Sequence, residues 1–304
     1  MRLLRIYPAA WRARYGEEFE ALLEELDGVA RMSRHDRIDV MRAGVGERLH
    51  VFGLAGLPPR ERAREGSLLV LWAWTLFVLG GIGVQKASEH WQAVTPPAKQ
   101  GLPAAAFDVL VVVAGAGSAL VQLGVALVLP RLVALIRGGG WAQIRRPIIR
   151  AGLLSMLTAA ATILLAQWAH SLSPAARNGH DVAYSGAFAV WAIFVAVCLF
   201  AWSAAAAATT RRLALSVGLL RVEASLGAAV AVAMAVMTIA TAVWWEAVAT
   251  TAPWFFEGRP VGSNTSVLVA NMIAPMLLML CATSLGAVGS MRALRAIASG
   301  ARPL

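Results

Sequence analysis

The chain has 304 residues, of which 59% are hydrophobic and only 14% are charged, and its mean hydropathy is +0.66. These values exclude an ordinary soluble globular domain. The formal net charge of +10 is divided among short segments between apolar runs, so we expect these charges to face anionic lipid headgroups rather than nucleic acid. Cys198 and Cys281 both fall in apolar runs, so we expect them to be small apolar fillers, and nothing in the sequence supports a disulfide framework.

The first predicted helix begins near Pro8, because a proline costs nothing in the first turn of a helix. Asp27 and Gly28 supply a stop signal. Apolar residues recur between them at spacings of three and four, which predicts an amphipathic helix. The residues of this apolar stripe are Trp11, Tyr15, Phe19, Leu22, Leu23 and Leu26.

A second helix is predicted to begin at Ser33, which is a good N-cap with Asp36 three residues later. Its apolar stripe consists of Ile38, Met41, Val45, Leu49 and Phe52. We therefore expect residues 1–56 to form a small water-compatible helical hairpin, called the head here.

The two apolar stripes need a cover, which a hairpin fold, the membrane or a partner protein could supply. The first helix carries six acids after residue 16, and anionic lipid would repel them. A self-packed hairpin that only aids folding and a docking module for a cytoplasmic protein both remain open. In the second case the partner-binding residues are Trp11, Arg12, Tyr15, Glu17, Glu18, Phe19 and Leu22.

The head also carries the pattern Y-P-x-x-W-R-x-R-Y-G-E-E, which runs from Tyr7 to Glu18 and is followed by L-L-x-x-L. This pattern resembles the cytoplasmic HAAS-type signalling domains and the permease prefix domains of bacterial, especially actinobacterial, membrane proteins. The resemblance covers about the first 55 residues. It implies a short helical module joined to transmembrane spans, in signalling contexts or ahead of transporter permeases.

After the head, Pro58 and Pro59 predict a break, so residues 57–66 are expected to form a juxtamembrane linker. Six apolar runs follow, and each is long enough to cross a bilayer as a helix. They cover residues 68–84, 107–129, 148–169, 183–208, 226–249 and 267–288. We therefore predict an all-α polytopic membrane protein with a six-helix bundle over residues 67–290 and a basic cytoplasmic tail over residues 291–304.

The orientation follows from the basic residues, of which 23 of 27 lie in residues 1–66 (the head and the linker), two alternate connections and the tail. Cytoplasmic segments of membrane proteins carry this excess of Lys and Arg. Both termini are therefore expected in the cytoplasm, with the protein in the plasma membrane.

Small residues at four-residue spacing, such as Ala282, Gly286 and Ser290, favour close helix packing in the bundle, with a homodimer contact as the alternative. The triplet Gly138-Gly139-Gly140 is expected to be a turn rather than a phosphate cradle, because no Lys-Ser/Thr follows it.

The middles of the predicted spans carry almost no ionisable residue, and the acids Asp108, Glu223 and Glu246 lie near span ends. We found no catalytic motif, cofactor motif or metal-ligand spacing, and we expect no enzyme. Histidines and acids on the outer side are expected to form a polar rim, with metal binding as the alternative. They are His90, His170, His180, Glu89, Asp108, Asp181, Glu246 and Glu257.

The function that we expect is that of a non-enzymatic membrane regulator whose head binds a cytoplasmic protein, such as a sigma factor or another transcription regulator. The alternative is a transporter or a membrane subunit of a transport complex.

Overall fold

The computed structural model describes residues 6–29, 33–51, 58–87, 100–173, 176, 182–213, 215–251 and 265–300. All regular elements in these ranges are helices, as the sequence predicted. They are α1 (Ala9–Val29), α2 (Arg34–Val51), α3 (Pro59–Ala87), α4 (Leu102–Leu135), the short π-helical turn η4 (Ile136–Gly140), α5 (Trp141–Ser171), α6 (Val182–Thr210), α7 (Val217–Thr251) and α9 (Thr265–Gly300).

Five helical stretches in the described residues are long and apolar enough to cross a membrane. They are Pro59–Lys86, Leu102–Ser171, Val182–Thr210, Val217–Thr251 and Ile273–Ser299. The second stretch has 70 residues and contains both α4 and α5. Each of the six apolar runs predicted from the sequence lies inside one helix, and the polytopic helical class is confirmed.

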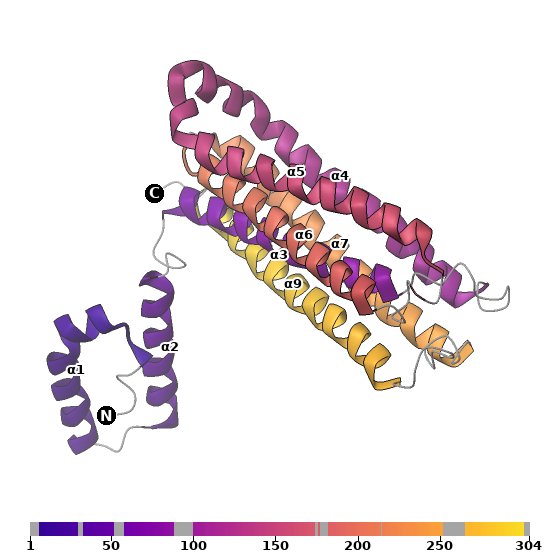
Figure 1. The fold of residues 1–304 in the computed structure, drawn as a ribbon. Helices are drawn as coiled ribbons and strands as arrows, with labels where there is room; N and C mark the ends of the chain where they lie inside the picture. The colour runs from indigo at the N-terminus through magenta and orange to yellow at the C-terminus, as the bar shows by residue number, and fades with distance from the viewer. Residues whose placement is uncertain are drawn as a thin grey trace.

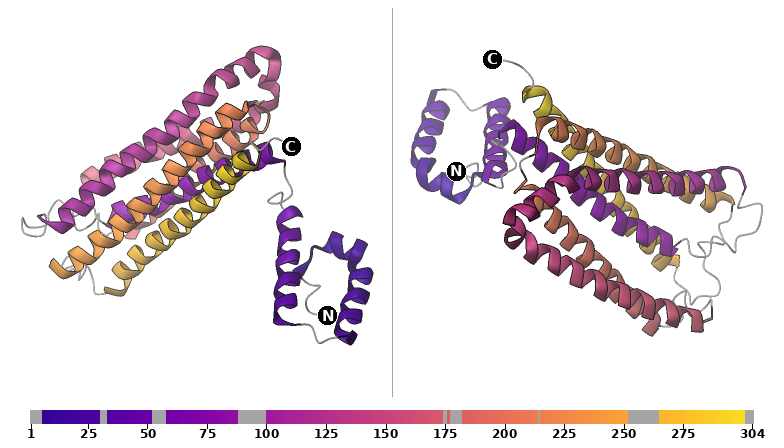
Figure 2. Two further views of the ribbon diagram at one scale, coloured as in Figure 1. Left: turned by 180° about the vertical axis from the view of Figure 1, so that it is seen from behind. Right: turned by 90° about the horizontal axis from the view of Figure 1, so that it is seen from above.

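The long helices form an elongated bundle (Figure 1). Helix α3 packs along α9 and also contacts α7 and α6, while α4 packs on α7 and α5 on α6. The second panel of Figure 2 shows that α4 and α5 diverge from their shared turn. The bundle is therefore built around α3, and the α5–α6 pair joins it through α6.

The close approach of α3 and α9 depends on glycine. A Cβ built on Gly80 would lie 2.9 Å from the carbonyl oxygen of Pro275, and one built on Gly83 would lie 2.5 Å from Cγ of the same proline. Glycine is therefore needed at both positions, because a side chain would push the two helices apart.

The predicted small-residue motif lies inside the bundle. Ala282, Gly286 and Ser290 are buried, and Ala282 joins Ala73, Met234 and other residues in the main apolar core. These positions serve packing within the chain, which was the favoured interpretation of the motif.

The chain reverses direction between α4 and α5 at the predicted glycine turn. Gly139 has a φ of 82°, a left-handed conformation that side chains rarely adopt. Gly140 is buried, and a Cβ there would lie 2.6 Å from Cδ1 of Leu135. The glycines thus allow a tight reversal without a long loop.

The structure differs from the prediction at both borders of the bundle. Residues 59–66, expected as a linker, form the first turns of α3, because Pro59 stands at a helix start where its missing N–H is not needed. Residues 291–300, expected as a tail, continue α9 to Gly300. The basic residues of both segments therefore belong to the ends of α3 and α9.

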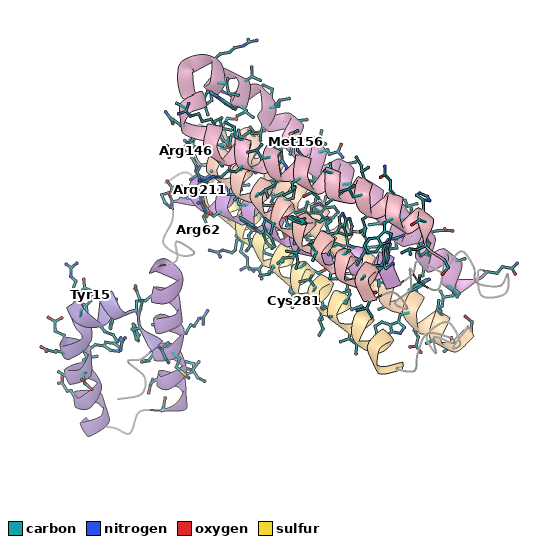
Figure 3. The ribbon with its side chains drawn as sticks, in the orientation of Figure 1. Tyr15, Arg62, Arg146, Met156, Arg211 and Cys281 are labelled. Atoms are coloured by element: carbon teal, nitrogen blue, oxygen red, sulfur yellow. The ribbon has the colours of Figure 1, made fainter. Side chains whose placement is uncertain are left out.

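The basic segments of the bundle gather at one end. Arg62 of α3, Arg146 of α5 and Arg211 after α6 lie at the same end of the bundle (Figure 3). The C-terminal end of α9 lies there as well (Figure 1). This grouping matches the segments that the sequence assigned to one side of a membrane.

Candidate functional site

The head is organised around Tyr7, which is 3% exposed. Its ring stacks on Trp11 with centroids 4.2 Å apart and contacts Phe19 at 5.4 Å. Trp11 and Phe19 also meet edge to face at 5.4 Å. Such aromatic pairs add stability beyond the area they bury. The rings of Tyr7, Trp11 and Phe19 therefore form a small core of the head, called the aromatic core here.

Tyr7 also joins the two helices of the head. Its hydroxyl donates a hydrogen bond to the carbonyl oxygen of Val40 in α2 at 3.1 Å. A Cβ built on Gly44 would lie 3.0 Å from Cε2 of Tyr7 and 2.9 Å from Cγ2 of Ile6. Gly44 therefore provides the surface on which the N-terminal segment rests, which explains a glycine inside a helix. Burial raises the pKa of Tyr7, and the carboxylate of Glu47 adds to this rise.

The start of α2 confirms the predicted capping box. The Ser33 N–H donates to Oδ2 of Asp36 at 3.0 Å, and the Asp36 N–H donates to Oγ of Ser33 at 3.2 Å. These reciprocal bonds satisfy backbone donors that a helix start leaves unpaired. Hydrogen bonds with Ser33 lower the pKa of Asp36. The side chain of Ser33 has the larger effect and its backbone the smaller one.

One face of α1 is exposed and combines apolar with acidic side chains. Tyr15 is 40% exposed and Leu22 is 52% exposed. Glu18 and Glu25 are also exposed, and their spacing of three and four residues from Tyr15 and Leu22 places all four on one face. We call these four residues the acidic face.

Two residues of the predicted apolar stripe of α2, Ile38 and Met41, are exposed. Val40 and Gly44 meet the N-terminal segment, whereas Ile38 is 54% exposed and Met41 is 39% exposed. The predicted stripe of α2 is thus uncovered at both residues.

The seven predicted partner-binding residues divide into two groups. Trp11 and Phe19 lie in the aromatic core and are only partly exposed, so they position the helix. The exposed group comprises Arg12, Tyr15, Glu17, Glu18 and Leu22. Sequence periodicity missed Tyr7 because this residue precedes α1 and lies outside its repeat.

An ion pair closes the basic end of the bundle. Arg211 donates from Nε and Nη2 to the two carboxylate oxygens of Glu65, at 2.9 and 3.0 Å. Arg64 donates from Nη1 to the Arg211 carbonyl oxygen at 3.2 Å. Helix α3 is therefore fastened to the connection between α6 and α7, an arrangement that the sequence did not reveal.

The acids of the long helices are scattered. Asp108 of α4 and Glu246 of α7 are exposed. Glu223 of α7 faces α4, where a Cβ on Gly124 would lie 3.5 Å from its Oε2, and its Oε1 is buried without a hydrogen-bond partner. Asp108 and Glu246 belong to the packed helices α4 and α7, where Phe107 meets Trp244 at 6.3 Å, whereas Glu223 lies about six turns from Glu246 along α7.

No group of three His, Cys, Asp or Glu side chains that could hold a metal ion occurs among the described residues. His170 belongs to α5 and is exposed. The remaining predicted rim residues lie outside the described ranges; they are Glu89, His90, His180, Asp181 and Glu257.

No protein-family model, curated protein or solved structure matches this chain. The class that the fold defines is an all-helical protein with five candidate membrane-spanning stretches in its described part. The function is therefore inferred from the surfaces of the molecule itself.

Proposed function

We propose that this protein is a non-enzymatic membrane regulator whose head binds a basic helix of a cytoplasmic protein. The observation that carries the proposal is the acidic face of α1. The Tyr15 ring meets Trp11 of the aromatic core at 5.6 Å and yet stays 40% exposed, and Leu22 is 52% exposed. Exposed apolar side chains flanked by charges are typical of a protein-binding surface.

The charge of this face favours a basic partner. Glu18 and Glu25 are exposed, and no ion pair joins either of them to a basic side chain in the described ranges. A basic amphipathic helix would cover Tyr15 and Leu22 with its apolar side and would place its cations beside these acids. Proteins that bind nucleic acid carry such helices, which makes a transcription regulator or sigma factor the partner class that we propose.

The proposal includes a topology with six crossings and both termini in the cytoplasm. Helices α4 and α5 have 34 and 31 residues, and each exceeds the roughly 20 residues needed to cross the hydrocarbon core. The basic residues collect at the end of the bundle where α3 begins, which supports a cytoplasmic location for that end. The head is then held next to the inner membrane surface.

The similarity of the head to HAAS-type and permease prefix domains is compatible with this role. Tyr7 and Trp11, which carry part of the pattern, belong to the aromatic core. The shared pattern thus supports a common head architecture, while the exposed residues would select the partner.

The test measures how strongly the full-length protein in native membranes binds the cytoplasmic partner. It compares the variants Leu22→Arg and Ala13→Arg. Ala13 is exposed and lies nine residues from Leu22, on the opposite side of α1 at about 100° per residue. Each variant adds one positive charge to an exposed position of the same helix. Only the variant on the acidic face should lose the partner.

The supporting result has three parts: a protein captured by the unmodified chain, a basic helical peptide of that protein at the contact, and at least about tenfold weaker binding for Leu22→Arg, as expected for the loss of a hot spot. Equal binding by both variants would refute the proposed surface. Capture by an uncharged or acidic segment would refute the proposed partner class.

A further inference from the structure

The turn between α4 and α5 carries a cluster of arginines with no acid nearby in the sequence. No Asp or Glu occurs between Asp108 and Asp181. The arginines all belong to α4, η4 and α5 and are exposed; they are Arg131, Arg137, Arg145, Arg146 and Arg150. Within the described residues no carboxylate forms an ion pair with any of the five, so their charge is available to an external anion.

Three of these arginines share the outward side of α5. Arg145, Arg146 and Arg150 are exposed, whereas Ile144 and Ala151 on the other side of the helix are completely buried. The bundle therefore fixes the rotation of α5 about its axis and directs the three guanidinium groups away from the protein. Figure 3 shows Arg146 at the end of the bundle.

The same outward side continues into a strongly apolar surface. Beyond Arg150, Leu153 is 62% exposed and Met156 is 72% exposed, and the apolar exposure extends to Leu164. From Arg150 to Trp168 the helix covers 18 residues, or about 27 Å at 1.5 Å per residue. This length is close to the roughly 30 Å of a bilayer hydrocarbon core. Arg150 and Trp168 would therefore lie at the two borders of the hydrocarbon core.

We propose that the α4–α5 turn is a docking surface for anionic phospholipid headgroups, with Arg145, Arg146 and Arg150 as the residues that contact the phosphates. Guanidinium groups bind phosphate oxygens in pairs of hydrogen bonds. Their position at the border of a lipid-facing apolar surface selects a headgroup over a soluble anion. Trp141 and Ile136, exposed at the turn itself, suit the interface between headgroups and water.

This surface is independent of the head and of any protein that the head binds. It would hold anionic lipids next to the place where α4 and α5 diverge. The alternative macromolecule for an arginine cluster is nucleic acid, but the apolar continuation of α5 favours lipid, because a nucleic-acid surface does not require a neighbouring apolar helix face.

The experiment reconstitutes the full-length chain in phosphatidylcholine bilayers and measures association of spin-labelled phosphatidylglycerol and phosphatidylcholine by electron paramagnetic resonance. We expect the unmodified chain to prefer phosphatidylglycerol, and the preference to fall as salt is raised. Replacing Arg145, Arg146 and Arg150 together by Gln should lower this preference by at least about fivefold, which is the effect of a single basic side chain at an anionic surface.

A matched control removes three exposed arginines elsewhere at the same end, by Arg212→Gln, Arg221→Gln and Arg295→Gln. This control should retain most of the preference. A third variant, Arg145→Lys with Arg146→Lys and Arg150→Lys, keeps the three charges but loses the paired hydrogen bonds of the guanidinium groups. Its preference should therefore lie between those of the unmodified chain and of the variant in which the same three arginines are replaced by Gln.

Equal loss in the two Gln variants would overturn the proposal, because the preference would then reflect the total charge. A Lys variant that prefers phosphatidylglycerol as strongly as the unmodified chain would overturn the proposed guanidinium–phosphate contacts. A Lys variant that is indistinguishable from the variant in which Arg145, Arg146 and Arg150 are replaced by Gln would overturn the proposal as well. Displacement of phosphatidylglycerol by duplex DNA at physiological salt would assign the arginines to nucleic acid instead.

Discussion

Gly66 of α3 and Gly289 of α9 bring the backbones of the two helices into direct contact. A Cβ built on either glycine would lie 2.8 Å from the carbonyl oxygen of the other. Lipid is as apolar as a leucine side chain, so helices in a membrane associate through such close packing. The contact thus fixes the first and last helices of the bundle against each other.

Replacing Gly289 by Ala should destabilise the bundle. The new methyl group would also lie 3.1 Å from the Val70 backbone nitrogen, and a backbone cannot rotate away as a side chain can. Overpacking of this kind costs about 1–3 kcal/mol. The midpoint of thermal unfolding in detergent, followed by tryptophan fluorescence, should therefore fall.

The control for this variant is Gly152→Ala in α5, where a Cβ would meet nothing within 4 Å. Alanine is the better helix former by about 1 kcal/mol, so this variant should unfold at the same or a slightly higher temperature. A Gly289→Ala protein as stable as the Gly152→Ala protein would contradict the packing described for α3 and α9.

Tyr7→Phe should loosen the head while leaving the aromatic core in place. The phenylalanine ring can still stack on Trp11, but the hydrogen bond to Val40 is lost. Such a bond is worth about 1 kcal/mol. Amide hydrogen exchange of the full-length chain should become faster in α2, with little change in α9. Unchanged exchange in α2 would show that Tyr7 does not join the two helices.

Alkaline pH should have a similar effect on the unmodified head. Burial raises the pKa of Tyr7 above its unfolded value, so the folded head favours the neutral phenol. This stabilisation is complete below the unfolded pKa of about 10 and is lost as the pH rises through the folded pKa. Exchange in α2 should accelerate above about pH 10, and the increase should be smaller in Tyr7→Phe. An equal increase in both proteins would contradict this role.

The ion pair between Glu65 and Arg211 should contribute modestly to stability. Its side chains are 24% and 57% exposed, and pairs with such access to solvent are worth at most about 1 kcal/mol. Reversing one charge, by Glu65→Arg, should increase hydrogen exchange in residues 211–216. The double variant Glu65→Arg with Arg211→Glu should restore it. Failure of the double variant to differ from the single one would show that the pair does not fasten this connection.

Local signals in the sequence predicted most of the fold. Apolar runs predicted the long helices because lipid allows few other backbone structures, and the capping box at Ser33 and Asp36 and the turn at Gly139 follow from local chemistry. The contacts of Gly66 with Gly289 and of Glu65 with Arg211 join distant segments, which local patterns do not pair.

The candidate site was predicted only in part for a related reason. The spacing of Trp11, Tyr15, Phe19 and Leu22 predicted one apolar stripe. Tyr7 contacts Trp11 and Phe19, so these two residues of the stripe are used inside the head, whereas Tyr15 and Leu22 remain exposed. A tyrosine placed before the helix carries no periodic signal, so this division required the structure.

The most direct test of the proposed function is photo-crosslinking from benzoylphenylalanine placed at Leu22 of the full-length chain in intact cells, with Ala13 as the control position. The acidic face predicts an adduct with a basic helical peptide of a cytoplasmic protein, formed from Leu22 and absent from Ala13. Adducts from Leu22 only with lipid, or only with the chain's own arginine-rich residues 131–150, would contradict the proposal.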